Sequence, residues 1–134
     1  MWRSDQVEAP PAPPTLARVL DVARALADPS RLTALVALAA GEMCLCQVVD
    51  LLGLAPSTVS KHMNQLLAAG LVERRKVGRW HYFRVAGDAA PPEVSAALEW
   101  LRSALAGVPD ADLVAQRACC VRDKDLAQLV EVYG

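Results

Sequence analysis

Hydrophobic residues recur every three or four positions along the first part of the chain, which is the spacing of helices that bury one face. One such series predicts a first helix over residues 16–26. A second helix follows, with Asp28 as its N-cap and Pro29 at its first position, and Gly41 ends it. The pattern therefore predicts two successive helices before the first glycine.

Two further periodic segments follow Gly41. Apolar spacing over residues 45–52 predicts a short third helix that ends at Gly53. A fourth helix has Pro56 in its first turn and ends at Gly70. The buried stripe of this helix leaves a polar face outside it, made of Ser57, Thr58, Lys61, His62 and Gln65.

The period changes after Gly70, where two β-prone runs flank Gly78 and Arg79. A glycine first in a two-residue loop favours a type II′ hairpin. A further helix then carries a seam of apolar residues with 4-3-4 spacing, which is typical of a surface for a partner helix. The seam residues are Val94, Leu98, Leu101 and Leu105. A short helix is expected from Asp125.

Composition changes this picture little, but the distribution of charge changes it more. The 134 residues carry a net charge of −1, which argues against general nucleic-acid binding. Between residues 57 and 84, however, six cations face the single acid Glu73, so 6 − 1 gives +5. Such a local basic face suits a site-specific DNA binder. The cations are Lys61, Arg74, Arg75, Lys76, Arg79 and Arg84.

The organisation expected from these features is a disordered, Pro-rich leader (1–14), one domain (15–107) and a C-terminal tail (108–134) with a cysteine pair. The leader lacks the apolar core of a signal peptide, and no apolar run reaches the roughly 18 residues of a membrane span. We therefore expect a cytoplasmic protein with reduced cysteines.

A short helix, a glycine turn, a polar helix and a basic hairpin follow one another in the order of a winged helix-turn-helix, a mainly α fold with a small β-hairpin wing. The second helix of that motif enters the major groove, and the wing contacts the backbone or the adjacent minor groove. The predicted contacts with double-stranded DNA are Ser57, Thr58, Ser60, Lys61, His62, Gln65, Arg74, Arg75, Lys76 and Arg79.

Four cysteines supply the candidate sensing chemistry, because thiolates select soft, thiophilic ions. Cys44 and Cys46 stand at the start of the third helix, where the helix dipole favours the thiolate. Residues i and i+2 of a regular helix point about 200° apart, so binding one ion is expected to unwind the first turn. Cys119 and Cys120 are flanked by arginines, which also favour thiolates.

The stretches "LADPSRLTALVAL" and "GEMCLCQVVDLLGLAPSTVSKHMNQLLAAGLVERRKVGRWHYFRV" resemble the arsenical-resistance repressor family (ArsR/SmtB) of bacterial metal sensors. The resemblance runs from about Leu16 to Val85, with the seam helix behind it. It implies a homodimer held by the first and last helices and bound to a palindromic operator. It also implies that Glu42, Cys44 and Cys46 match the E-x-C-x-C site of sensors induced by As(III) or Sb(III).

One departure from that family concerns the third ligand. Sensors with this motif often carry a third cysteine where this chain has Val49. Cys119 or Cys120 would supply it from the same or the partner chain, or would form a separate site for methylated arsenicals; both alternatives stay open. Asp and His ligands, which the family uses on its last helix, are missing from residues 93–105, which offer only Glu93 and Glu99.

The leading interpretation is a repressor released by As(III) or Sb(III), and two other functions compete with it. A redox or persulfide sensor of the same fold would use a disulfide or polysulfide in place of the metalloid. A thiol enzyme using C-x-C lacks a βαβ pattern and a supporting His or Asp, so the protein is not expected to be an enzyme or to need an organic cofactor.

Overall fold

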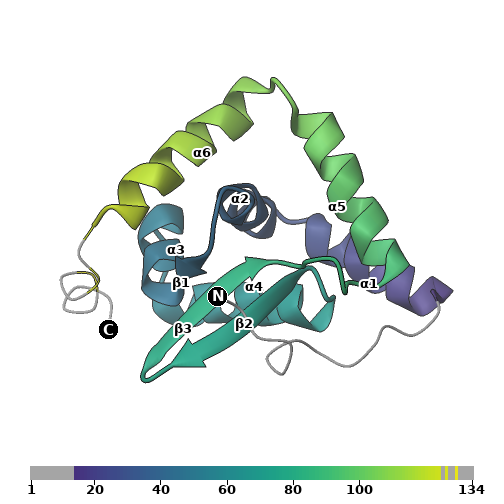
Figure 1. Cartoon of the computed structure of the whole chain (residues 1–134), viewed down its shortest axis with the longest axis horizontal. Helices are drawn as coiled ribbons and strands as arrows, with labels where there is room; N and C mark the ends of the chain where they lie inside the picture. Colours follow the sequence, from purple (N-terminus) through teal and green to yellow (C-terminus); the bar gives the residue numbers. More distant parts are fainter. Residues whose placement is uncertain (1–13, 125, 127–128, 130–134) are drawn as a thin grey trace.

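The structure, a computed structural model, describes residues 14–124, 126 and 129. Six helices and three short strands follow one another in this part of the chain (Figure 1). None of these helices is long and apolar enough to cross a membrane. In chain order the elements are α1 (Leu16–Leu26), α2 (Pro29–Leu38), β1 (Met43–Cys44), α3 (Leu45–Leu52), α4 (Pro56–Ala68), β2 (Val72–Val77), β3 (Trp80–Val85), α5 (Pro92–Leu105) and α6 (Pro109–Arg122).

The predicted start of α2 and end of α3 are confirmed, whereas α2 ends at Leu38, before the expected stop at Gly41. The Asp28 carboxylate accepts a hydrogen bond from the Arg31 backbone N–H at 3.0 Å, and Pro29 opens α2. Gly53 ends α3 in the left-handed region at φ +67, where a Cβ would be strained. A tight turn therefore separates α3 from α4, as a helix-turn-helix requires.

One hydrophobic core packs against the buried faces of α3 and α4. Val59, Met63 and Leu66 of α4 have no exposed surface, and they pack in one cluster with buried residues of α2, α3 and the hairpin. This leaves the opposite face of α4 toward solvent. The fold class expected from the sequence, a mainly helical winged helix-turn-helix with a small β-sheet, is confirmed.

The sheet has the strand order β1-β3-β2, and both pairs are antiparallel. Gly78 has φ +59 while Arg79 has no positive φ, as a type II′ loop requires. The sequence did not predict β1, because a strand of two residues has no detectable period. Its residues pair with β3 as Met43↔Phe83 and Cys44↔Tyr82, which attaches the hairpin to the start of α3.

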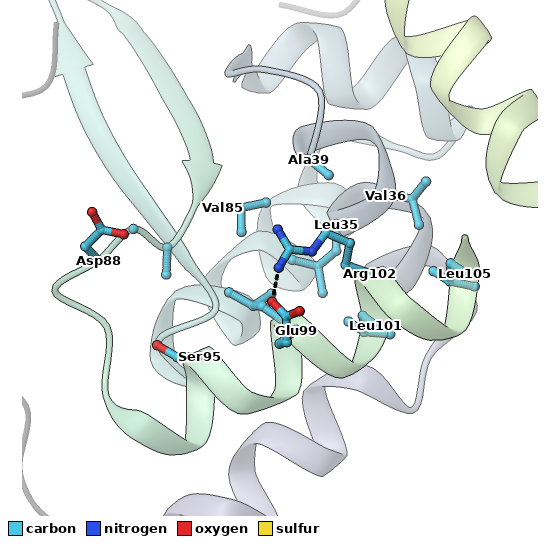
Figure 2. A pocket seen from close by; sticks show the side chains of 13 residues that line it. Leu35, Val36, Ala39, Val85, Asp88, Ser95, Glu99, Leu101, Arg102 and Leu105 are labelled. Carbon is cyan, nitrogen blue, oxygen red and sulfur yellow. Dashed lines mark hydrogen bonds and ion pairs between the residues drawn. The ribbon is translucent and has the colours of Figure 1, made fainter. Parts of the chain in front are cut away.

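The seam of α5 corrects one expectation. Val94 is 1% exposed and Leu101 is 9% exposed, and both pack in the core of this chain. They are therefore not free to contact a partner helix. A 4-3-4 series is also what one face of a helix needs to cover a small domain. The cover is incomplete, since a mostly apolar pocket of about 530 Å³ remains between α2, the end of β3 and α5, with Glu99 and Arg102 among its lining residues (Figure 2).

Helix α6 was not predicted, because its apolar residues follow no helical period. Gly107 (φ +74) forms the turn between α5 and α6. Helix α5 packs on α1, and α6 packs on α2 and α3 (Figure 1). Arg122 donates to the carbonyls of Ala37 (2.5 Å) and Gly41 (3.4 Å), and Arg117 donates to that of Leu51 (3.0 Å). The segment expected as a tail thus packs on the helix-turn-helix.

The short helix expected from Asp125 falls mostly outside the described residues. Only Leu126 and Leu129 are described there, and both are helical. Asp125 itself lies outside the described part, so the start of that helix stays a prediction.

Replacing Arg122 with Met should lower the free energy of unfolding by about 1–3 kcal/mol, because a charge-assisted donor is lost at half-buried backbone carbonyls. Urea unfolding at fixed protein concentration measures this, and the m-value should not change. Arg102→Met is the matched control, since Arg102 is exposed on α5 and bonds only to the exposed Glu99 among the described contacts. Equal losses in both variants would contradict a fastening role for Arg122.

Candidate nucleic-acid interface and thiol site

The exposed face of α4 carries most of the predicted DNA contacts. Ser57, Thr58 and Lys61 are exposed, whereas Ser60 is half-buried. Pro56 opens the helix, so the two hydroxyls stand in its first turn. Small hydroxyls at a helix N-terminus permit close approach to bases and phosphates.

Farther along α4, the predicted contacts His62 and Gln65 have a protein partner that sequence reasoning missed. The Arg31 Nη1 atom lies 3.2 Å from His62 Nδ1 and also donates to Gln65 Oε1. The same guanidinium donates to the carbonyls of Arg24 (3.0 Å) and Ala25 (2.8 Å) at the end of α1. Arg31 therefore joins α1 to the recognition helix.

The electrostatics around Arg31 agree with this role. Its backbone N–H bonds to Asp28 and holds the pKa of that carboxyl below its ordinary value, with the Arg31 charge adding to the effect. Asp28 Oδ2 also lies 3.8 Å from His62 Nδ1. The D-P-S-R motif predicts the helix cap and belongs to the family resemblance, but it gives no indication that Arg31 contacts His62 and Gln65.

Two of the wing cations are neutralised within the chain. Arg84 forms an ion pair of 2.6 Å with Glu73, its partner in the β2–β3 register. Arg75 grips the carboxylate of Glu42 through two nitrogen atoms, Nη2 at 2.7 Å and Nε at 3.3 Å. Hydrogen bonding to Glu42 raises the pKa of Arg75 above its ordinary value. These two arginines therefore do not add to the positive charge that this region presents to DNA.

The remaining predicted cations of this surface are exposed. Arg74 and Lys76 are two positions apart on β2, so their side chains lie on the same face of the strand. Arg79, at the tip of the wing, places its guanidinium 5.2 Å from the centre of the Trp80 ring. Together with Lys61 of α4 they form the basic surface, defined here as Lys61, Arg74, Lys76 and Arg79.

Cys44 and Cys46 lie closer together than a helix allows. Cys44 is extended (φ −73, ψ 152), being both the last residue of β1 and the N-cap of α3, and only Cys46 is helical. Their Sγ atoms are 3.1 Å apart. The expectation that both sulfurs can meet only if the first turn unwinds is wrong, because Cys44 precedes that turn.

The expectation that the helix start favours the Cys46 thiolate is also wrong. Burial, followed by the hydrogen bond and the negative charge of Cys44, raises the pKa of Cys46 to about 12. Cys44 is 2% exposed, and its backbone N–H is held by the buried Gln47 side chain at 2.8 Å. Cys46 is therefore a protonated, half-buried thiol at neutral pH.

Cys119 and Cys120 are exposed on α6. The flanking Arg117 and Arg122 were expected to favour their thiolates, but both guanidinium groups bond to carbonyls of neighbouring helices. Within residues 14–124, 126 and 129, no three His, Cys, Asp or Glu side chains are grouped to hold one ion. The described fold of one subunit therefore does not bring a third thiol to Cys44 and Cys46.

Comparison with known proteins identifies relatives of this chain. The family model for "Bacterial regulatory protein, arsR family" matches residues 28–74. An uncharacterised HTH-type transcriptional regulator of Methanocaldococcus jannaschii is 38% identical over 72 residues, which are 53% of this chain and 81% of that protein. An arsenic resistance transcriptional regulator of Pseudomonas putida is 37% identical over 93 residues, 68% of this chain and 66% of that protein.

A solved structure agrees with these relatives. It is the homodimeric winged helix-turn-helix DNA-binding domain of a possible ArsR-family transcriptional regulator from Mycobacterium bovis. The identity is 31%, the TM-score is 0.58, and the likeness covers 68% of this chain and 81% of that one. The resemblance seen in the sequence motifs is therefore confirmed.

The raised pKa of Cys46 predicts an order of alkylation. Iodoacetamide at pH 8 should modify the exposed Cys119 and Cys120 first, whereas Cys46 should react slowly because its thiolate is scarce and its side chain half-buried. Peptide mass spectrometry over a time course resolves the four positions, and urea-unfolded protein gives the control in which the difference disappears. Equal rates for Cys46 and Cys119 in the folded protein would contradict a protonated, half-buried Cys46.

Proposed function

The chain belongs to the arsR family of bacterial regulatory proteins, and we propose that it is a repressor which binds operator DNA as a homodimer and is released by As(III) or Sb(III) at Cys44 and Cys46. The plain conclusion is a winged helix-turn-helix transcriptional regulator, a class of DNA-binding proteins and not of enzymes. The observation that carries the proposal is the pair of sulfurs 3.1 Å apart at the junction of wing and helix-turn-helix.

The proposed DNA contacts divide into two groups. Ser57, Thr58 and Ser60, with Lys61, occupy the first two turns of α4 and would approach base edges in the major groove. His62 and Gln65 would act from the position that Arg31 gives them. The wing cations of the basic surface would contact phosphates, which sets affinity more than sequence preference.

The proposed dimer rests on an apolar surface of α1 and α5, which lie side by side (Figure 1). Leu16 is 91% exposed and Trp100 62%, and Val19 and Leu20 are also exposed. Large apolar side chains exposed on two helices that contact each other favour a protein interface there. The homodimeric relative from Mycobacterium bovis supports the same assembly.

The chemistry of release starts from the two neighbouring cysteines, of which Cys46 is held protonated. Each thiol gives its proton to a hydroxide of arsenous acid, and water leaves as the sulfur–arsenic bond forms. The raised pKa of Cys46 is no obstacle, since the leaving hydroxide takes up the proton. The two sulfurs are soft donors, as As(III) and Sb(III) require. The relative from Pseudomonas putida, named for arsenic resistance, supports this choice of inducer.

The third donor is proposed to come from outside the Cys44–Cys46 pair. Cys119 and Cys120 remain the candidates, from the same chain after a rearrangement or from the partner, because they are the only other cysteines of the sequence. The alternative is that they form their own exposed site for a methylated arsenical, which needs only two sulfurs.

A second function is favoured by the same distance. Sulfurs 3.1 Å apart are placed for a disulfide, so a redox or persulfide sensor of the same fold is the alternative proposal. The two are separated by whether the reduced protein leaves DNA on adding arsenite with no oxidant present.

Replacing Arg74 with Ala should weaken binding to every DNA sequence alike, because a phosphate contact is lost. The slope of log K against log salt should become shallower by about 0.9. Fluorescence anisotropy on the promoter fragment and on a scrambled duplex measures both, with Arg102→Ala, an exposed cation of α5 that is not among the proposed DNA contacts, as the control. A loss confined to the promoter sequence would contradict a phosphate contact.

Cys44→Ser and Cys46→Ser should each leave DNA affinity nearly intact and abolish release by arsenite, since one of two adjacent soft donors is missing. Anisotropy of reduced protein on its promoter fragment, titrated with arsenite, measures release. Cys119→Ser/Cys120→Ser is run beside them: release in wild type alone places the third thiolate on α6, and equal release makes Cys44 and Cys46 sufficient. Release that persists without Cys44 and Cys46 would overturn the proposed inducer site.

A further inference from the structure

The geometry points to the wing as a second output of the cysteine pair: we propose that the Glu42–Arg75 ion pair tethers the Cys44–Cys46 segment to the wing, so that a bond formed at the sulfurs moves the wing directly. The proposal makes Glu42 a positioning residue rather than a metalloid ligand. It rests on the proposed function for the identity of the inducer, but not for the mechanical link itself.

The link begins in the sheet. Cys44 of β1 is paired with Tyr82 of β3, and Tyr82 is paired with Arg75 of β2. One of the two candidate ligands is thus part of the row of residues that crosses all three strands. A displacement of its backbone has to be absorbed by the ladder that carries the wing.

The ion pair closes the same row from the other side. Glu42, two residues before Cys44, binds Arg75 with two hydrogen bonds, and the Arg75 guanidinium lies 5.2 Å from the centre of the Tyr82 ring. The side chains are only 34% and 19% exposed for Glu42 and Arg75, respectively. A bidentate, half-buried pair fixes orientation as well as distance, which a single exposed pair does not.

The cysteine segment has little slack between these attachments. Residues 42 and 44 are fixed to the wing by the ion pair and the β1–β3 ladder, and residues 44–52 continue directly into α3. Gln47 binds the Cys44 backbone N–H across this junction. The two Sγ atoms are 3.1 Å apart, so whatever change of that separation the new bond requires beyond side-chain rotation moves α3 or the strand. The strand carries the wing with it, and Glu42 transmits that movement to β2.

Trp80 reports on the wing without DNA. It begins β3 next to the loop, and the indole N–H signals of the three tryptophans can be followed in a proton–nitrogen NMR spectrum, with Trp80→Phe assigning the signal. Two perturbations of the cysteines are used. Arsenite is added to the reduced wild type. Diamide is added to Cys119→Ser/Cys120→Ser, where it takes up two hydrogen atoms as the Cys44–Cys46 disulfide forms.

Glu42→Gln is the test variant, because it keeps the shape of the side chain and removes the charge that holds Arg75. We expect the Trp80 signal to shift when the cysteines react, and this shift to fall about fivefold in Glu42→Gln. In each sample, mass spectrometry and a colorimetric count of free thiols confirm that the cysteines have reacted. Glu99→Gln, which removes an exposed carboxylate paired with Arg102 on α5, is the matched control and should keep the full shift.

Arg75→Lys separates the tether from a general effect of charge. It retains the cation but loses the two-nitrogen grip, so an intermediate shift is expected. A Trp80 signal that ignores both perturbations in the wild type, or that shifts equally in Glu42→Gln, would overturn the tether. A response to diamide but not to arsenite would support the tether and remove arsenite as the inducer, so the two proposals fail separately.

Discussion

Two residues of β-structure, Met43 and Cys44, join the parts of this protein that face DNA. Their pairing with Phe83 and Tyr82 attaches the hairpin to the start of α3, and α3 supports α4. Val72 and Phe83 also bury the base of the hairpin in the core, and the β1 pairing adds a backbone connection that continues directly into α3. The candidate sensing residues lie at this junction, between the hairpin and the helix that supports α4.

Arginines from one helix bind the ends of others throughout the domain. Arg31 donates to carbonyls in the last turn of α1, Arg122 to one in the last turn of α2, and Arg117 to one in the last turn of α3. The last carbonyls of a helix lack partners within it and carry partial negative charge, so a guanidinium satisfies both needs. A domain rich in Ala, Leu and Val has few other directional contacts between helices, and these bonds fix their relative positions.

The sequence was sufficient where local patterns determine structure. Apolar period, Asp28, Gly53 and the Gly78-Arg79 loop predicted helices α1 to α5 and the hairpin, because periodicity, capping and turn chemistry act within a few residues. It was insufficient where partners are distant along the chain: the pairing of Cys44 with Tyr82, the grip of Glu42 on Arg75, and the packing of α6 are tertiary contacts. The pKa of Cys46 was misjudged for the same reason, since burial and the neighbouring thiol outweigh the helix dipole.

The protonated state of Cys46 also affects which reagents this thiol reacts with. Burial and the neighbouring Cys44 raise the pKa of Cys46, so its thiol is protonated at neutral pH. Peroxides and ordinary alkylating agents attack the thiolate and are slowed accordingly. A reagent that brings its own base, such as a metalloid hydroxide, is not. Cys46 therefore favours ligands that remove its proton as they bind over reagents that need a free thiolate.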